Sequence, residues 1–360
     1  MSRRVEFLYL QQEDCVEAGG LDMKGTLTAV ERSFFLHGKG DYIQPGKPVI
    51  RWGGPETEET TGRIMSMPSF LGGARYADEL TRRGLIGPVE TSGIKFIPSR
   101  PENPRTHGLP RANAVIIIVD PETLMPACIM DGTLVSAMRT GAASGVAAKV
   151  LARHGAEVMG LVGAGVQGVT QVMAITTGCP SIGRCKVFDI DQAASERFEA
   201  ELRRVGVEVE VEVVGTAEAA FTGSDVVATA TMAREPYVDP SWYEPGVLHC
   251  EISFWDTPPE ALQVIDFVVV DDWYQVEHHG VDVSVRAVRG GAISKDKVRG
   301  NLGEIIVGAA AGRRSDDERI FFNPIGLGIH DLSEAHRVYQ NALGLGLGRR
   351  LPLWEAPALG

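Results

Sequence analysis

The feature that most constrains this chain is an apolar run that ends in closely spaced glycines. Residues 158–168 read VMGLVGAGVQG, which gives the pattern Gly-x-Gly-x-x-Gly directly after a strand-like segment. In a strand that turns into a helix beneath a dinucleotide, the first glycine permits the turn, the second admits a pyrophosphate, and the third, here Gly168, lets the helix lie close to the strand. We therefore expect phosphate contacts at the start of the helix from Gly163, Ala164, Gly165, Val166 and Gln167.

A glycine pattern alone is a weak signal in a chain with 42 glycines, so its surroundings matter. A second apolar run ends at Asp189, which lies 21 residues after Gly168. A carboxylate near this offset binds ribose hydroxyls. Asp189 and Asp191 favour NAD over NADP, because a carboxylate repels a 2′-phosphate and no arginine follows directly. The alternative, a glycine-rich turn that binds nothing, is the weaker interpretation in this context.

The N-terminal part of the chain is predicted to be mostly sheet. One helix is expected at residues 22–35, and residues 72–88 are polar and loop- or helix-like. We predict strands from β-branched and apolar runs at residues 5–10, 48–52, 64–68, 93–97, 114–120 and 126–130, the last two as a hairpin.

From residue 133 onward, helical and strand-like segments alternate. This alternation predicts a parallel, doubly wound sheet of the Rossmann type. The predicted strands are at residues 158–162, 185–189, 207–213, 225–231, 247–252 and 267–271. We expect an α/β protein with a Rossmann domain at 136–317. A mixed α+β domain would comprise 1–135 and 318–360, where a strand at 319–322 and a helix at 332–343 return to it.

Composition excludes several classes of function. The net charge is −12 and no Lys/Arg-rich run occurs, which argues against nucleic acid or an anionic membrane as a partner. No apolar run approaches the ~20 residues of a membrane span, and the N-terminus does not resemble a secretory signal. The five cysteines form no Cys-x-x-Cys pair, and no cluster has metal-ligand spacing. We expect a cytoplasmic protein with free thiols and no metal.

Several segments together resemble the family of ornithine cyclodeaminase, mu-crystallin and archaeal alanine dehydrogenase. The resemblance covers most of the chain and includes residues 64–73, 93–95, 113–128, 131–133 (DGT), 138–144 (MRTGAAS), the glycine motif and 303–308. It implies a homodimer whose first domain binds an amino-acid substrate and forms the dimer interface. The second domain would bind the nicotinamide cofactor NAD, with further contacts from Thr229 and Thr231.

Later segments narrow the resemblance to one branch, the N-(2-amino-2-carboxyethyl)-L-glutamate dehydrogenases, which form 2,3-diaminopropionate for siderophores and antibiotics. These segments are residues 252–256 (ISFWD), 268–275 (VVVDDWYQ) and 323–331 (NPIGLGIHD). Ornithine cyclodeaminases carry a Gly-Gly/Ala-Asp segment where this chain has SFWD, which makes cyclodeaminase activity less favoured. Residues 72–88 also look longer than usual for the family.

Four cations are candidates for the substrate site. Arg139, among small and apolar residues, suits a bidentate contact with an α-carboxylate, the alternative being a surface arginine. Lys95 interrupts an apolar strand and is either a site residue or a lysine at a sheet edge that reaches water. Arg51 matches a family arginine. Arg111 resembles the diaminopropionate branch, whose tricarboxylate substrate needs more cations than ornithine does, although a solvated turn arginine is an equal alternative.

Asp256 is the candidate acid/base, because it follows a strand expected to end at the edge of the sheet where ligands bind. Its alternative role is that of a turn or N-cap aspartate before Thr257-Pro258. The resemblance implies NAD-dependent oxidative cleavage of a secondary amine to 2,3-diaminopropionate and 2-oxoglutarate, with Lys95 or Asp256 moving protons. Three alternatives remain: a lyase that recycles NAD, an imine reductase or amino-acid dehydrogenase, and a non-enzymatic mu-crystallin-like binder.

Overall fold

A computed structural model of the chain describes residues 4–53, 61–85, 90–356 and 358, and divides it into two compact units. Unit 1 comprises residues 1–36, 40–139 and 327–360, and unit 2 comprises 37–39 and 140–326. The chain enters unit 2 within helix α5 (Thr133–Leu151), close to the expected boundary. It returns later than expected, because strand β15 (Ile320–Asn323) is fully buried and pairs within the sheet of unit 2.

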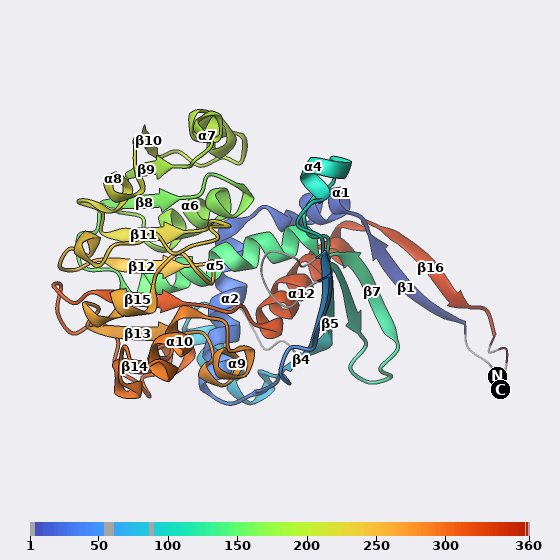
Figure 1. The fold of residues 1–360 in the computed structure, drawn as a ribbon. Helices are drawn as coiled ribbons and strands as arrows, with labels where there is room; N and C mark the ends of the chain where they lie inside the picture. Colours follow the sequence, from blue (N-terminus) through green and yellow to red (C-terminus); the bar gives the residue numbers. More distant parts are fainter. Residues whose placement is uncertain (1–3, 54–60, 86–89, 357, 359–360) are drawn as a thin grey trace. The chain divides into compact units, whose positions relative to one another are not determined.

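Unit 1 is built on a mixed sheet with the strand order β16-β1-β7-β6-β5-β4-β2, and β3 also pairs with β4 (Figure 1). The pair β1–β7 is parallel and the remaining pairs are antiparallel, including the predicted hairpin β6–β7. The strands are β1 (Val5–Leu10), β2 (Tyr42–Ile43), β3 (Val49–Trp52), β4 (Gly62–Leu71), β5 (Thr91–Ser99), β6 (Val115–Val119), β7 (Pro126–Asp131) and β16 (Arg349–Trp354).

Helix α12 (Gly328–Leu345) covers one face of this sheet and contacts β4, β5 and β6. The predicted apolar stripe of this helix packs against Ile116 and Ile118 in a common core. Residues 74–82 of the polar segment form a short 3₁₀ turn and α3, whereas residues 86–88 lie outside the described residues. The other helical segments are α1 (Gln12–Cys15), a π-helical turn (Val16–Gly20), α2 (Met23–Gly38), the turn η2 (Ala74–Tyr76), α3 (Ala77–Arg82) and α4 (Asn103–His107).

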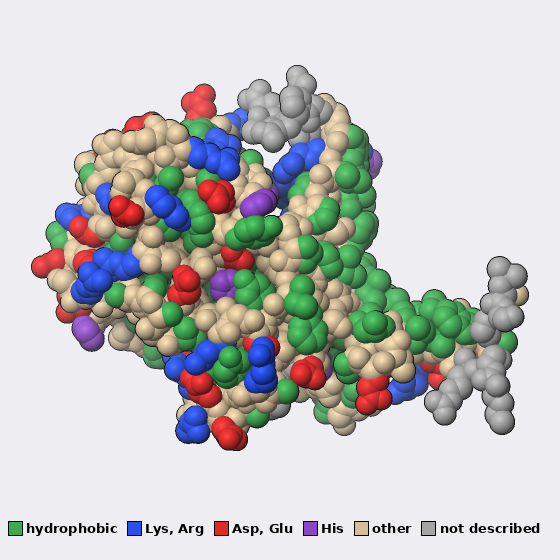
Figure 2. All heavy atoms as spheres, turned by 90° about the horizontal axis from the view of Figure 1, so that it is seen from below, with side chains coloured by type: hydrophobic (Ala, Val, Ile, Leu, Met, Phe, Trp, Pro, Cys, Tyr) green, Lys and Arg blue, Asp and Glu red, His purple; other side chains and the backbone are tan. Residues whose placement is uncertain are grey.

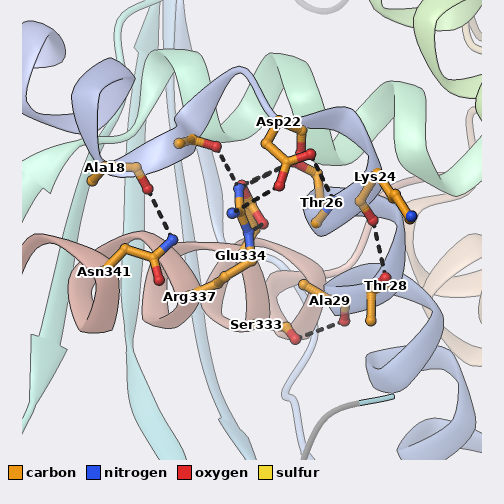
Figure 3. A network of polar contacts seen from close by, with 12 residues as sticks. Ala18, Asp22, Lys24, Thr26, Thr28, Ala29, Ser333, Glu334, Arg337 and Asn341 are labelled. Carbon is orange, nitrogen blue, oxygen red and sulfur yellow. Dashed lines mark hydrogen bonds and ion pairs between the residues drawn. The ribbon is translucent and has the colours of Figure 1, made fainter. Parts of the chain in front are cut away.

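A polar network fixes the start of α12 against α2 (Figure 3). The buried carboxylate of Glu334 accepts a hydrogen bond from Thr26 Oγ1 at 3.0 Å and an ion-pair contact from Arg337 at 2.7 Å. Ser333 Oγ donates to the carbonyl of Ala29 in α2 at 2.7 Å. Asp331 lies on the same helix, three residues before Glu334.

Unit 2 contains a parallel sheet with the order β10-β9-β8-β11-β12-β15-β13-β14 (Figure 1). Its first five strands in sequence lie in the order 3-2-1-4-5 of a dinucleotide-binding sheet, which confirms the predicted fold class. The strands are β8 (Val158–Val162), β9 (Arg184–Phe188), β10 (Glu210–Val213), β11 (Val226–Thr229), β12 (Leu248–Glu251), β13 (Phe267–Val270), β14 (Val298–Asn301) and β15.

The helices of unit 2 connect these strands. Strand β10 is shorter than the predicted 207–213, because only residues 210–213 pair with β9. Within the described residues, no helix is both long and apolar enough to cross a membrane. The helical segments are α6 (Val166–Gly178), α7 (Gln192–Arg204), α8 (Ala217–Phe221), η3 (Pro240–Trp242), η4 (Pro259–Gln263), α9 (Trp273–His279), α10 (Val283–Arg289), η5 (Lys295–Lys297) and α11 (Leu302–Ile306).

Candidate functional site

The glycine turn between β8 and α6 has the geometry that a dinucleotide requires. Gly163 has φ of +106°, and a Cβ there would lie 2.7 Å from the carbonyl oxygen of Ala230. A Cβ at Gly168 would lie 2.2 Å from the carbonyl oxygen of Gly163, so this glycine permits close packing of helix on strand. A Cβ at Gly165 would meet no atom within 4 Å, which leaves the first turn of α6 open to a phosphate group.

Asp189 lies at the end of β9, beside this turn. Its carboxylate accepts hydrogen bonds from Ala164 N at 2.8 Å and from Asp191 N at 2.9 Å. The side chain of Asp191 instead caps α7 by accepting from Ala193 N at 3.1 Å. Of the two predicted aspartates, Asp189 is therefore the one whose carboxylate lies at the glycine turn. The chain thus fits NAD there: the N–H groups of the first turn of α6 would hold the pyrophosphate, and Asp189 would hold the ribose.

Asp256 and Thr231 form a pair beyond the carboxyl ends of β12 and β11. Thr231 Oγ1 donates a hydrogen bond to Asp256 Oδ1, and the backbone N–H of Thr231 is 3.4 Å from Oδ2. Asp256 is fully buried, and the residue that caps the following 3₁₀ turn is Pro258. The alternative role of Asp256 as an N-cap is therefore wrong, and its carboxylate is held at the edge of the sheet where ligands bind.

Thr229 has a different environment from Thr231. Its hydroxyl lies 2.9 Å from His249 Nε2, and Nδ1 of the same imidazole lies 2.8 Å from the hydroxyl of Tyr243. All three side chains are buried, and burial lowers the pKa of His249 to about 3, so the ring is neutral. The Thr229 hydroxyl thus has an internal partner, and a cofactor contact at Thr229 stays a prediction.

Glu251 is a buried acid that the sequence analysis did not single out. It is the last residue of β12 and is fully buried. Burial, and then the charge of Asp256, raise the pKa of Glu251 well above its usual range. The sequence signal that could have found Glu251 was its position at the end of a predicted strand, five residues before the candidate acid/base Asp256.

In unit 1, two predicted cations meet on one carboxylate. Lys95 Nζ and Arg139 Nε each lie 2.8 Å from Oδ1 of Asp331, and Lys95 Nζ lies 3.1 Å from Ser136 Oγ. Lys95 is 1% exposed and lies on β5 between two other strands, so its assignment to a sheet edge is wrong. Burial, and then the charge of Arg139, lower the pKa of Lys95 to about 7 against the opposing effect of Asp331.

Asp331 is the residue of this cluster that sequence reasoning missed. It lies in the first turn of α12, fully buried, next to the apolar stripe of that helix. Its second oxygen, Oδ2, is buried and makes no hydrogen bond to the described residues. An acid within a helical apolar stripe requires a buried cation, and this mismatch was the signal that could have found it.

The other two predicted arginines lie near a third, Arg63, that was not predicted. Arg51 on β3 and Arg63 on β4 are directly opposite each other in the antiparallel pair. Arg111 follows α4 and is half-buried, and its Nε has no hydrogen-bond partner in the described part of the chain. Burial, and then the charges of Arg111 and Arg51, lower the pKa of Arg63. Arg111 is thus not a fully solvated turn residue. Within the described residues, no group of His, Cys, Asp and Glu could hold a metal ion.

Comparison with known proteins gives matches over nearly the whole chain. The profile of the ornithine cyclodeaminase/mu-crystallin family matches residues 16–346. An N-((2S)-2-amino-2-carboxyethyl)-L-glutamate dehydrogenase of Staphylococcus aureus is 34% identical over 349 residues, which are 97% of this chain and 99% of that protein.

Solved structures agree with these matches. The Delta(1)-pyrroline-2-carboxylate reductase of Thermococcus litoralis, in complex with NADH and L-proline, is similar with a TM-score of 0.81 and 31% identity, covering 95% of this chain and 99% of that chain. An archaeal alanine dehydrogenase dimer with bound NAD has a TM-score of 0.81 and 30% identity, covering 97% of this chain and 100% of that chain.

Proposed function

The chain belongs to the ornithine cyclodeaminase/mu-crystallin family, and we propose that it oxidatively cleaves a secondary amine of the N-(2-amino-2-carboxyethyl)-L-glutamate type. It is an NAD-dependent oxidoreductase of this family. The products of the proposed reaction are 2,3-diaminopropionate and 2-oxoglutarate. A cytoplasmic location, also part of the proposal, fits the five unpaired cysteines.

The observation that carries the proposal is the cluster of Lys95, Arg139 and Asp331. Two buried cations share one carboxylate oxygen, which leaves one positive charge without a partner of opposite sign in the cluster. A substrate α-carboxylate supplies that missing negative charge, and the guanidinium of Arg139 can bind it in a bidentate way. Lys95, with a pKa of about 7, can both accept and donate a proton near neutral pH.

The chemistry follows from these roles. Held by the first turn of α6 and Asp189, NAD would supply the two-electron oxidation of the Cα–N bond of the glutamate half to a C=N bond. Water adds to Cα, and the proton that it loses passes to the neutral amine of Lys95 or to the carboxylate of Asp256. The C–N bond then breaks as the nitrogen takes up a proton, which releases 2,3-diaminopropionate and leaves 2-oxoglutarate.

The experiment is incubation of the purified chain with the amine and NAD, with NADH read by absorbance and products identified by mass spectrometry. We expect one NADH for each 2-oxoglutarate formed. Ammonia release from ornithine without net NADH would instead establish the lyase alternative. The Lys95→Met variant should lose turnover but retain NADH binding, because the glycine turn is untouched, and Lys149→Met on the far end of α5 is a matched control.

We also propose a homodimer that uses the open face of the unit 1 sheet. The face opposite α12 carries cross-strand pairs of apolar side chains such as Phe96 with Val115, each 40% exposed. Figure 2 shows hydrophobic side chains along the β1–β16 ribbon as well, where Leu351 and Leu353 are exposed. Light scattering should give a dimer for the wild type and a monomer for Val115→Glu; a monomeric wild type would contradict the proposal.

A further inference from the structure

We propose that Arg63, together with Arg51, forms a second carboxylate-binding subsite on the sheet face that carries Lys95. The ligand chemistry is a carboxylate of the substrate beyond the one at the reacting carbon. This inference rests on the proposed function, because it identifies the residue that separates a polycarboxylate amine from smaller amino acids.

Strand register places the arginines and Lys95 on one face. Lys95 pairs with Met67, and Ser99, four residues further along β5, pairs with Arg63. Directly paired residues of an antiparallel sheet share a face, and so do residues at even spacing along one strand. Arg63 in turn pairs with Arg51 on β3, so both arginines project from the same face as Lys95.

Spacing along the strand suits a substrate with carboxylates at both ends. Four residues of β5 separate the row of Lys95 from the row of Arg63, which is ~13 Å at the rise of a strand. The long side chains of Lys95 and Arg63 can each extend toward the middle of this interval. A monocarboxylate bound at Lys95 would leave the far row without a ligand, whereas a longer polycarboxylate reaches both.

Charge gives the second argument. Like charges directly opposite in a sheet are destabilising, yet Arg51 and Arg63 occupy such a pair. No carboxylate of the described residues forms an ion pair with either of them or with Arg111. Burial, and then the charges of Arg111 and Arg51, lower the pKa of Arg63, as expected where no carboxylate of the described residues faces its guanidinium. A bound carboxylate would compensate it.

The test compares Arg63→Gln and Arg63→Lys with wild type in the presence of NADH, by calorimetry. The ligands are N-(2-amino-2-carboxyethyl)-L-glutamate, an analogue without the γ-carboxylate, and an analogue without the carboxyethyl carboxylate. We expect Arg63→Gln to weaken the full amine by roughly 10- to 100-fold, the worth of a charged hydrogen bond. Arg63→Lys should fall between, since it keeps the charge without the bidentate fork. Arg82→Gln, an exposed arginine on α3, is the matched control.

One analogue should bind wild type and Arg63→Gln equally, and that analogue identifies which carboxylate Arg63 holds. The subsite is overturned if Arg63→Gln weakens the binding of both analogues equally. It is also overturned if Arg63→Gln does not weaken the binding of the full amine. If wild type binds none of the amines, the proposed function fails, and the subsite is judged on 2-oxoglutarate against 2-oxobutyrate. The subsite is supported if wild type binds 2-oxoglutarate more tightly than 2-oxobutyrate and Arg63→Gln loses this preference. It is overturned if wild type has no such preference or if Arg63→Gln keeps it.

Discussion

The ammonium of Lys95 lies 2.8 Å from the carboxylate of Asp331, with both side chains buried. The two residues are 236 positions apart in the chain, because β5 supplies the lysine and α12 supplies the aspartate. The C-terminal helix therefore does more than complete the core of unit 1. Its Asp331 opposes the effects of burial and of Arg139, which lower the pKa of a lysine that we place in the chemical step.

Asp331→Asn should shift the pH dependence of turnover to lower pH. Asp331 opposes the lowering of the Lys95 pKa, so its removal should lower that pKa further below about 7. The limb of the kcat/KM profile that belongs to Lys95 should move by about one to three pH units, the usual effect of one close charge. Steady-state rates measured from about pH 5 to 9 give this limb.

Glu334→Gln is the matched control, because Glu334 is a buried acid on the same helix whose partners are Thr26 and Arg337. The Lys95 limb of the kcat/KM profile of Glu334→Gln should coincide with that of the wild type, even where the variant is less stable. A profile of Asp331→Asn that coincides with wild type would remove the assigned role of the Lys95–Asp331 pair.

Lys95→Met should change how stability depends on pH. In the folded protein the pKa of Lys95 is lowered to about 7, whereas in the unfolded chain it is near 10.5. Between these values the unfolded chain binds more protons, so Lys95 makes the free energy of unfolding rise with pH, by up to about 1.4 kcal/mol per pH unit. Below pH 7 Lys95 is protonated in both the folded and the unfolded state, so its contribution to the slope disappears. Chemical denaturation of wild type and variant at several pH values gives the difference in slope, and parallel curves would contradict the lowered pKa.

Sequence reasoning succeeded where the signal is local. The turn at Gly163 and the end of β9 at Asp189 follow from residue types within a few positions of each other, so the strands, the turn and the helix could be predicted together. The strand around Lys95 was also recognisable, since a lysine in an apolar run is conspicuous.

Partners distant in the chain could not be predicted in the same way. Asp331 and Arg63 became visible once the fold brought α12 onto β5 and placed β3 beside β4. The hydroxyl of Thr229 bonds to His249 on the neighbouring strand β12, a partner 20 residues away in the chain. The domain boundary near residue 318 was misplaced, because the residues of a buried strand such as β15 do not indicate which of the two sheets it joins.

The double substitution Asp189→Ser with Ile190→Arg should move cofactor preference from NAD toward NADP. Asp189 supplies the negative charge beside the glycine turn, and Ile190 is 96% exposed directly after it, so an arginine there can reach a 2′-phosphate. We expect the ratio of kcat/KM for NAD over NADP to fall by roughly 100-fold, because a charged hydrogen bond forms to NADP and a repulsion is removed. Asp191→Asn retains its cap on α7 and should leave the ratio unchanged. A change with Asp191→Asn instead would assign the ribose contact to Asp191.

Arg337→Met should destabilise unit 1 more than the double variant with Glu334→Gln. Arg337 compensates the fully buried carboxylate of Glu334, whose pKa is raised chiefly by burial (Figure 3). Removal of the guanidinium alone leaves a buried acid without its cation, which costs about 3 kcal/mol, whereas an amide at position 334 has no charge to compensate. Urea denaturation of the four proteins of the double-mutant cycle measures the coupling. Strictly additive losses would mean that Glu334 is stabilised by Thr26 alone and that the ion pair contributes nothing to the attachment of α12.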